Sequence, residues 1–209
     1  MKKTLLLLLA ATLIALTLIG CEKSPAEEKP DIDDLLIISP AKIDEPADKM
    51  EDTALISLFE NTLYYNASKL RGWILGELDL DYDSVFETND DRLEYVLVKN
   101  ISDMAAFKAN FEAVFSNALL SKAVYPWVIE GDTPLFVEND GKLYFNKNTG
   151  GGVGFAADFT RANVTAKSEN AFEIGVPMIT ADDSEGEIFI YKIVQQNGKW
   201  VLDSHHYFQ

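Results

Sequence analysis

Residues 51–83 read EDTALISLFENTLYYNASKLRGWILGELDLDYD, and the spacing of their apolar side chains changes within this stretch. Up to position 75, apolar residues recur at steps of three and four, which places them on one face of a helix. They are Leu55, Phe59, Leu63, Ala67 or Leu70, and Ile74. Residues 77–83 instead alternate acidic and apolar side chains, the pattern of a half-buried strand. The stretch therefore predicts a long helix, capped by Asp52 or Thr53, followed by a strand.

The residues after this strand predict another strand and two further helices. The apolar run 93–98 reads as a strand. Ser102 is placed to cap a helix over 104–115, whose apolar residues again share one face. A second helix covers 119–124, and we expect Pro126 to end it, because the residue before a proline is pushed out of helical geometry.

The rest of the chain is rich in strands. Asn139-Asp140-Gly141 and Asn197-Gly198 predict tight hairpins, because glycine readily takes the positive φ that such turns require. The expected strands are 135–137, 143–145, 155–159, 162–167, 172–179, 187–195 and 200–202. This order predicts an α+β fold, in which a long N-terminal helix and a middle helix pair pack against a mostly antiparallel sheet.

The N-terminus has the layout of an export signal. Met1-Lys2-Lys3 is basic, the fifteen residues 5–19 carry no charge, and Leu18-Ile19-Gly20-Cys21 closes the run. Such a run is shorter than the ~20 residues that a membrane-spanning helix needs. It resembles a bacterial lipoprotein signal, which implies lipidation of Cys21 and an extracytoplasmic protein held on the membrane by its lipid anchor alone. The alternatives are an uncleaved anchor and a secretory signal with a chance cysteine.

Residues 21–50 predict an acidic, proline-rich tether, which is too polar and too interrupted to form a core. It contains one apolar patch, Leu35-Leu36-Ile37-Ile38, which we expect to dock on the domain as an edge strand. The predicted organisation is a signal peptide at 1–20, the lipid-anchored tether at 21–50 and a single α/β binding domain at 51–209.

Charge and cysteine content exclude several functions. The formal net charge is −16, so the field of the protein will not steer it to nucleic acid or to anionic lipid headgroups. A basic protein or a cationic ligand fits this charge, although solubility alone also explains it. Cys21 is the only cysteine, so once it is lipidated no thiol remains for disulfides, metal binding or catalysis.

No catalytic motif follows the signal. The only histidines, His205 and His206, are neighbours in what we expect to be the last strand, where they should point to opposite faces. The motifs H-E-x-x-H and G-x-S-x-G are absent from the sequence. We therefore expect no enzymatic activity, no cofactor and no metal.

Two further patterns begin as ligand motifs and then fail. Asp79, Asp81 and Asp83 match the first ligand positions of a calcium loop, but Ser84 replaces the required glycine and Asp90 the bidentate glutamate. The sequence TGGGVG at 149–154 lacks the lysine of a phosphate-binding loop and lies between strands, where no helix dipole assists. It is a flexible connection or a mobile binding loop.

The order of elements, the segments 139–143 (NDGKL) and 197–202 (NGKWVL), and the glycine-rich loop between them resemble the IseA family. Its members are secreted inhibitors of the D,L-endopeptidases that cut peptidoglycan stem peptides. The likeness covers residues 51–208. It implies a two-lobed α/β fold with a cleft, which blocks the papain-like catalytic domain of a cell-wall hydrolase without doing chemistry itself. The lipoprotein signal and the tether set this chain apart from that family.

These observations predict a monomeric bacterial lipoprotein that inhibits a peptidoglycan hydrolase. We expect its contact surface at Glu77, Asp79, Asp81 and Asp83, together with Asn146, Gly150, Gly151 and Gly152. The alternative is a cystatin-like or NTF2-like module that binds a small ligand or an envelope partner. One sheet packed on one long helix would favour the alternative, and a middle helix pair forming its own lobe would favour the inhibitor.

Overall fold

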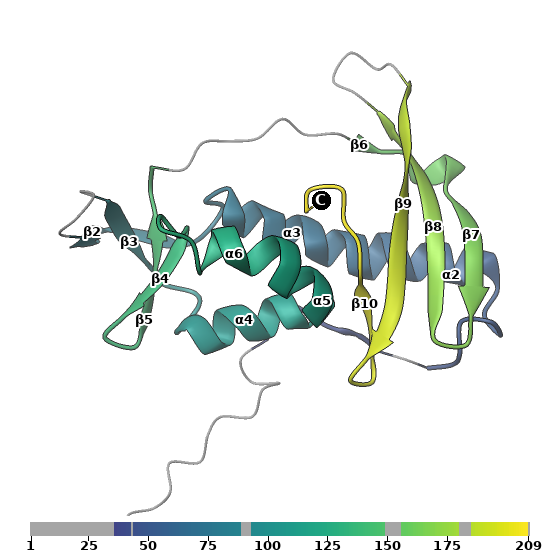
Figure 1. Ribbon diagram of the computed structural model, residues 1–209, viewed down its shortest axis with the longest axis horizontal. Helices are drawn as coiled ribbons and strands as arrows, with labels where there is room; N and C mark the ends of the chain where they lie inside the picture. The colour runs from purple at the N-terminus through teal and green to yellow at the C-terminus, as the bar shows by residue number, and fades with distance from the viewer. Residues whose placement is uncertain (1–35, 43, 89–92, 149–155, 180–184, 209) are drawn as a thin grey trace, which may run out of the picture. The chain divides into compact units, whose positions relative to one another are not determined.

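A long helix changes its hydrogen-bonding pattern along its length. In the computed structural model it consists of α2 (Asp52–Leu58), the π-helical segment η2 (Phe59–Tyr64) and α3 (Tyr65–Ile74) (Figure 1). The structure describes residues 36–42, 44–88, 93–148, 156–179 and 185–208. The predicted apolar face is confirmed, because all of its members are buried: Leu55, Phe59, Leu63, Ala67, Leu70 and Ile74. The N-cap is Glu51 instead of Asp52 or Thr53, and its side chain makes no capping hydrogen bond.

Among the described residues, the strands form two antiparallel sheets, which confirms the α+β fold. The four-stranded sheet has the order β2-β3-β5-β4, with β2 (Leu80–Glu87), β3 (Glu94–Val98), β4 (Phe136–Asn139) and β5 (Lys142–Asn146). The six-stranded sheet has the order β1-β10-β9-β8-β6, and β7 also pairs with β8. Its strands are β1 (Ala41–Lys42), β6 (Ala156–Ala157), β7 (Asn163–Ser168), β8 (Ala171–Ile179), β9 (Glu185–Gln196) and β10 (Lys199–Leu202).

Both predicted hairpins are confirmed. Asn139 pairs with Lys142 across a two-residue loop, in which Asp140 and Gly141 have φ angles of 50° and 70°. Asn197 and Gly198, at 51° and 74°, make the same kind of turn between β9 and β10. Two consecutive positive φ angles are the signature of the type I′ turn, whose twist matches that of the flanking strands.

The expected strand 155–159 is wrong in its second half. The strand β6 covers Ala156–Ala157, and the 3₁₀ helix η4 (Phe159–Arg161) follows at once. The side chain of Asp158 accepts a hydrogen bond from the backbone N–H of Thr160, at 3.1 Å, and caps this helix. A local side-chain bond of this kind competes with strand pairing, which alternation of residue types does not reveal.

The long helix contacts both sheets. At its N-terminus, Lys167 of β7 forms an ion pair with Asp52, at 2.8 Å, and donates a hydrogen bond to the carbonyl oxygen of Met50. At its C-terminus, Gly76 takes a φ of +88° and leaves room for the ring of Phe145 in β5, which would lie 3.2 Å from an added Cβ. One hydrophobic cluster includes residues of the helix and of both sheets.

The middle helices pack between β4 and β10. The helix α4 (Met104–Glu112) places Phe107 at 4.4 Å from Phe136 of β4, centroid to centroid. After it, the backbone N–H of Ser116 donates to the carbonyl oxygen of Leu202 in β10, at 2.8 Å. The expected cap Ser102 is wrong by one residue, because the carboxylate of Asp103 accepts the backbone N–H of Ala106.

The second middle helix is longer than predicted. It runs through α5 (Asn117–Leu119), the π-helical segment η3 (Leu120–Val124) and α6 (Tyr125–Val128). Pro126 does not end it, contrary to expectation, and lies in the first turn of α6. A proline is tolerated there because the backbone N–H that it lacks would have no partner at the start of a helix. No helix of the described residues is long and apolar enough to cross a membrane.

Part of the expected tether packs on the domain. Asn110 of α4 accepts the backbone N–H groups of Ile37 and Ile38, at 2.8 and 3.0 Å, and Asn66 of α3 donates to the carbonyl oxygen of Ser39. Ile38, Ala41 and Ala47 are buried. Ile38 of the apolar patch therefore docks on the domain, but the prediction that the patch is an edge strand is wrong: the described residues 36–38 form no strand, and the edge strand is β1, which begins three residues after Ile38. All described residues, from Leu36 to Phe208, fall within one compact unit.

Candidate functional site

The acidic residues expected at the contact surface do not share one uninterrupted face. Glu77 precedes β2, and its backbone N–H donates to the carbonyl oxygen of Gly72, at 2.8 Å. Asp79 forms an ion pair with Lys99, at 2.7 Å. Asp81 accepts hydrogen bonds from the backbone N–H of Asp83 and, at 2.8 Å, from the hydroxyl of Ser84, which lowers the pKa of Asp81. The carboxylate of Asp81 thus forms hydrogen bonds within its own turn.

The turn at Asp81 also shifts the register of β2. The pairing with β3 is interrupted between Asp81 and Val85, and the predicted alternation breaks there. Tyr82, expected on the buried face, is instead 66% exposed, and Val85 is 45% exposed. Asp83 is exposed beside them. Since β2 pairs only with β3 among the described strands, the surface of this edge strand combines free acidic groups with apolar ones.

The expected loop contacts divide between described residues and others. Asn146 is buried, and its side-chain oxygen accepts the backbone N–H of Asn148, at 3.0 Å. Its amide therefore holds the turn that leaves β5. Gly150, Gly151 and Gly152 lie outside the described residues, as does Cys21.

The structure brings together a cluster that the sequence did not predict. His205 and His206 follow β10 in a turn, and their rings stack with centroids 4.7 Å apart. The expectation that they point to opposite faces is therefore wrong, because β10 ends at Leu202 and the strand period no longer applies. The available signal was the tract His205-His206-Tyr207-Phe208, which joins the only histidines to two aromatic residues.

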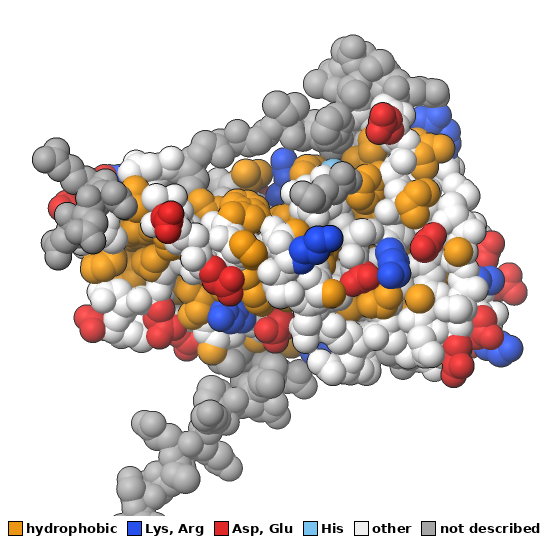
Figure 2. Space-filling model, viewed as in Figure 1, with side chains coloured by type: hydrophobic (Ala, Val, Ile, Leu, Met, Phe, Trp, Pro, Cys, Tyr) orange, Lys and Arg blue, Asp and Glu red, His pale blue; other side chains and the backbone are white. Residues whose placement is uncertain are grey.

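We call Tyr64, Tyr191, His205, His206 and Tyr207 the histidine cluster. Tyr64 comes from the π-helical segment η2 and stacks on both imidazoles, at 6.2 and 6.3 Å. The hydroxyl of Tyr191, on β9, lies 2.5 Å from Nδ1 of His206. The guanidinium of Arg71 covers the ring of Tyr207 at 3.8 Å. Figure 2 shows a small histidine surface on this face of the molecule, among hydrophobic side chains.

Burial keeps the titratable groups of the cluster uncharged. It holds the pKa of His205 well below its ordinary value of 6.5, and the neighbouring His206 and Arg71 lower the pKa further. Burial, with Arg71, lowers the pKa of His206 to about 4. Burial also raises the pKa of Tyr64 to about 12 and raises that of Tyr191. At neutral pH the imidazoles of His205 and His206 are therefore neutral, and the phenols of Tyr64 and Tyr191 are protonated.

Two cavities adjoin the histidine cluster, and a π-helical segment lines each of them. The C-terminal cavity, of about 340 Å³, is lined by Ala118, Leu119, Lys122, Ala123, Asp203, Ser204, His205 and Phe208. The helix cavity, of about 480 Å³, is lined by Glu60, Asn61, Tyr64, Tyr65, Ser68 and Phe159. Single π-helical turns within α-helices occur frequently at functional sites. The segments η3 and η2 supply residues to the first and the second cavity respectively.

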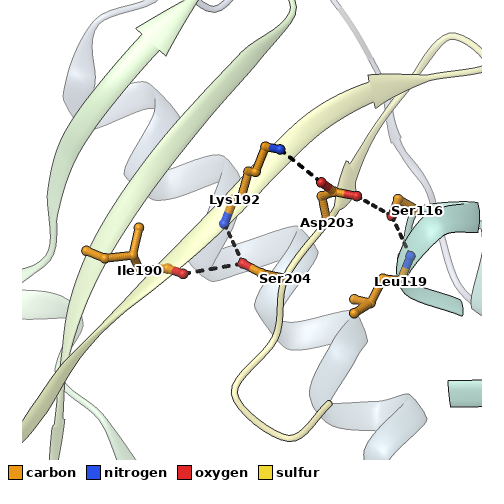
Figure 3. A network of polar contacts seen from close by, with 6 residues as sticks. All are labelled: Ser116, Leu119, Ile190, Lys192, Asp203 and Ser204. Carbon is orange, nitrogen blue, oxygen red and sulfur yellow. Dashed lines mark hydrogen bonds and ion pairs between the residues drawn. The ribbon is translucent and has the colours of Figure 1, made fainter. Parts of the chain in front are cut away.

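A polar network fixes one wall of the C-terminal cavity (Figure 3). Asp203 pairs with Lys192 of β9, at 3.1 Å, and accepts the hydroxyl of Ser116, at 2.5 Å. Ser116 in turn accepts the backbone N–H of Leu119, which caps α5. Ser204 accepts the backbone N–H of Lys192, at 2.8 Å. Asp203 and Ser204, the two residues before His205, are thus bound to β9, and Asp203 is also bound to the N-cap of α5.

This geometry suits recognition by hydrogen bonding more than proton transfer. The described residues show no hydrogen bond between either imidazole and a carboxylate, and the low pKa values make both rings weak bases at neutral pH. Within the described part of the chain, no three histidine, cysteine or acidic side chains are grouped to hold a metal ion.

No protein-family model matches this sequence, and no curated protein matches it either.

Proposed function

We propose that the protein is an extracytoplasmic lipoprotein, anchored through Cys21, that binds and inhibits a cell-wall D,L-endopeptidase without catalysing a reaction itself. One observation carries this proposal. The long helix contacts the six-stranded sheet at its start and the four-stranded sheet at its end. A cystatin-like module would instead wrap one sheet around one helix, whereas here helices bridge two sheets, although the middle helix pair shares one hydrophobic cluster with both sheets and forms no separate lobe among the described residues.

The edge strand β2 is the contact surface that fits this proposal best. Asp83 and Glu87 are exposed on it, next to the exposed side chains of Tyr82 and Val85. Exposed apolar groups beside like charges suit docking on a basic protein surface, with electrostatic steering of the encounter. Asp79 and Asp81 contribute less in this proposal, because Lys99 and Ser84 already engage them.

The test is capture from envelope extract on the chain from residue 22 onward, followed by an activity assay on any hydrolase retained. We expect a D,L-endopeptidase whose activity falls in the complex. In the double variant Asp83→Lys, Glu87→Lys, association at low salt should slow by about tenfold. The matched control, Glu130→Lys with Asp132→Lys, reverses the same number of exposed charges away from β2. Equal association rates for the two variants would refute the β2 surface, and failure to retain any hydrolase would refute the function.

The small-ligand alternative is favoured by a different observation, the two cavities beside the histidine cluster. Their volumes fall in the range of small-molecule sites. A ligand site is compatible with an inhibitor, since the β2 surface and the C-terminal cavity share no residue.

A further inference from the structure

His205 has one nitrogen paired and one unpaired. The backbone N–H of Tyr207 lies 3.3 Å from Nδ1 of His205, and a backbone N–H can only donate. Nδ1 is therefore the acceptor, which places the proton of the neutral imidazole on Nε2. This Nε2 is buried and has no hydrogen-bond partner among the described residues. The side chain as a whole is 1% exposed.

An unpaired buried donor is costly, at about 1–3 kcal/mol, so the Nε2–H of His205 favours any acceptor that can reach it. Aromatic rings surround the imidazole: Tyr64, His206, Phe115 and Phe208 have centroids within 6.2 Å of its own. Among the described residues, none of these rings accepts a hydrogen bond from Nε2 of His205. The C-terminal cavity, whose wall includes His205, is the space from which an acceptor can approach.

The charges at this cavity favour an anionic acceptor. Asp203 is already compensated by Lys192 and by the hydroxyl of Ser116. Lys122 is exposed at the cavity and forms no ion pair within the described part of the chain. The uncompensated charge at the site is thus positive, although the chain as a whole is acidic. Salt screens the distant acidic groups over about 8 Å at physiological ionic strength, so the local cation dominates.

The remaining lining favours an apolar body on the ligand. Ala118, Leu119, Ala123 and Phe208 present apolar surface. A cavity of about 340 Å³ is at the small end of ligand sites, which are mostly apolar with a few placed polar groups. The site therefore favours a ligand that can accept the Nε2–H of His205, pair with the ammonium group of Lys122 and cover a short apolar wall.

We propose that the C-terminal cavity binds a small monocarboxylate with an apolar body, whose carboxylate accepts the Nε2–H of His205 and faces the ammonium group of Lys122. Carboxylate acceptors make hydrogen bonds roughly twice as strong as neutral ones. The π-helical segment η3, which carries Lys122, supplies the other half of the site. This binding does not depend on the proposed inhibition of an endopeptidase.

The probe is octanoate, titrated calorimetrically into the chain from residue 22 onward, with octanol as the uncharged analogue. We expect one site for octanoate and about tenfold or more weaker binding of octanol, because octanol lacks the anionic acceptor. The ¹⁵N resonance of His205 Nε2 should shift on binding octanoate. Equal binding of acid and alcohol, or no saturable binding of octanoate, would overturn the proposal.

Two variants test the assigned groups. Lys122→Gln should weaken the binding of octanoate about fivefold and leave the binding of octanol unchanged, since only the ion pair is lost. Lys142→Gln, an exposed lysine on β5 outside the cavity, is the matched control and should bind octanoate as the parent chain does. His205→Phe keeps an aromatic ring and removes the donor while Lys122 remains, so it should reduce the preference for the acid. Unchanged octanoate affinity in both Lys122→Gln and a folded His205→Phe would contradict the assignment.

Discussion

Acidification from pH 7 to pH 5 should destabilise this protein through His205. Burial keeps the pKa of this histidine far below 6.5 in the folded state, so its ring stays neutral in that range. In the unfolded chain the same side chain takes up a proton as the pH falls below about 6.5. The unfolded state then binds more protons than the folded state, and the free energy of unfolding decreases as the pH falls.

The size of this loss of stability follows from the one proton that His205 takes up when the chain unfolds. For a histidine that stays neutral when folded, the loss between pH 7 and pH 5 is about 2 kcal/mol. His206, whose pKa is lowered to about 4, also stays largely neutral in this window and adds in the same direction. The carboxyls of Asp81 and Asp158 have a pKa below 3.8, so their contribution is lost only at lower pH and does not overlap this window.

Urea unfolding at a series of pH values measures how steeply the free energy of unfolding changes with pH. Near pH 5.5, replacing His205 by Phe should reduce the slope by about 0.9 proton, or about 1.2 kcal/mol per pH unit. The His206→Phe variant should reduce the slope as well, because the pKa of His206 is also lowered, to about 4. Parallel stability curves for the parent chain and His205→Phe would refute the burial of a neutral imidazole at this position.

Three substitutions test the packing. Asn110→Ala leaves one buried and one partly buried backbone N–H group unpaired, so we expect a loss of about 1–3 kcal/mol and earlier proteolysis before β1; unchanged proteolysis would contradict the docking of that segment. Gly76→Ala should cost about 1 kcal/mol more than Gly141→Ala in thermal unfolding, because both have positive φ but only Gly76 faces a ring; equal losses would refute the close approach. Ser116→Ala removes the cap of α5 and should cost about 1 kcal/mol in chemical unfolding, whereas Ser121→Ala, at an exposed site, should cost less than half of that.

Local patterns in the sequence predicted most of the elements. The helix face from Leu55 to Ile74 is buried as expected, and both two-residue hairpins form where glycine follows a residue that tolerates positive φ. These features depend on neighbours in the chain, so a single sequence reveals them. The α+β class follows from their order.

The errors arose where a side chain or a distant segment decides the backbone. Asp81 binds its own turn and exposes Tyr82, and Pro126 fits inside the second helix because it lies in the first turn of α6. The two π-helical segments leave no trace in the apolar spacing. The histidine cluster requires contact between Tyr64 and His205, which are far apart in the sequence, so their types alone did not predict it.

We propose that this chain inhibits an enzyme of the cell wall by binding to it. The most direct measurement is the cleavage of purified peptidoglycan by a D,L-endopeptidase, titrated with the chain from residue 22 onward. We predict that cleavage falls to a plateau as the two proteins approach equal concentrations, and that the chain alone releases no fragments. Full cleavage at a large excess of the chain, or cleavage by the chain itself, would refute inhibition by binding.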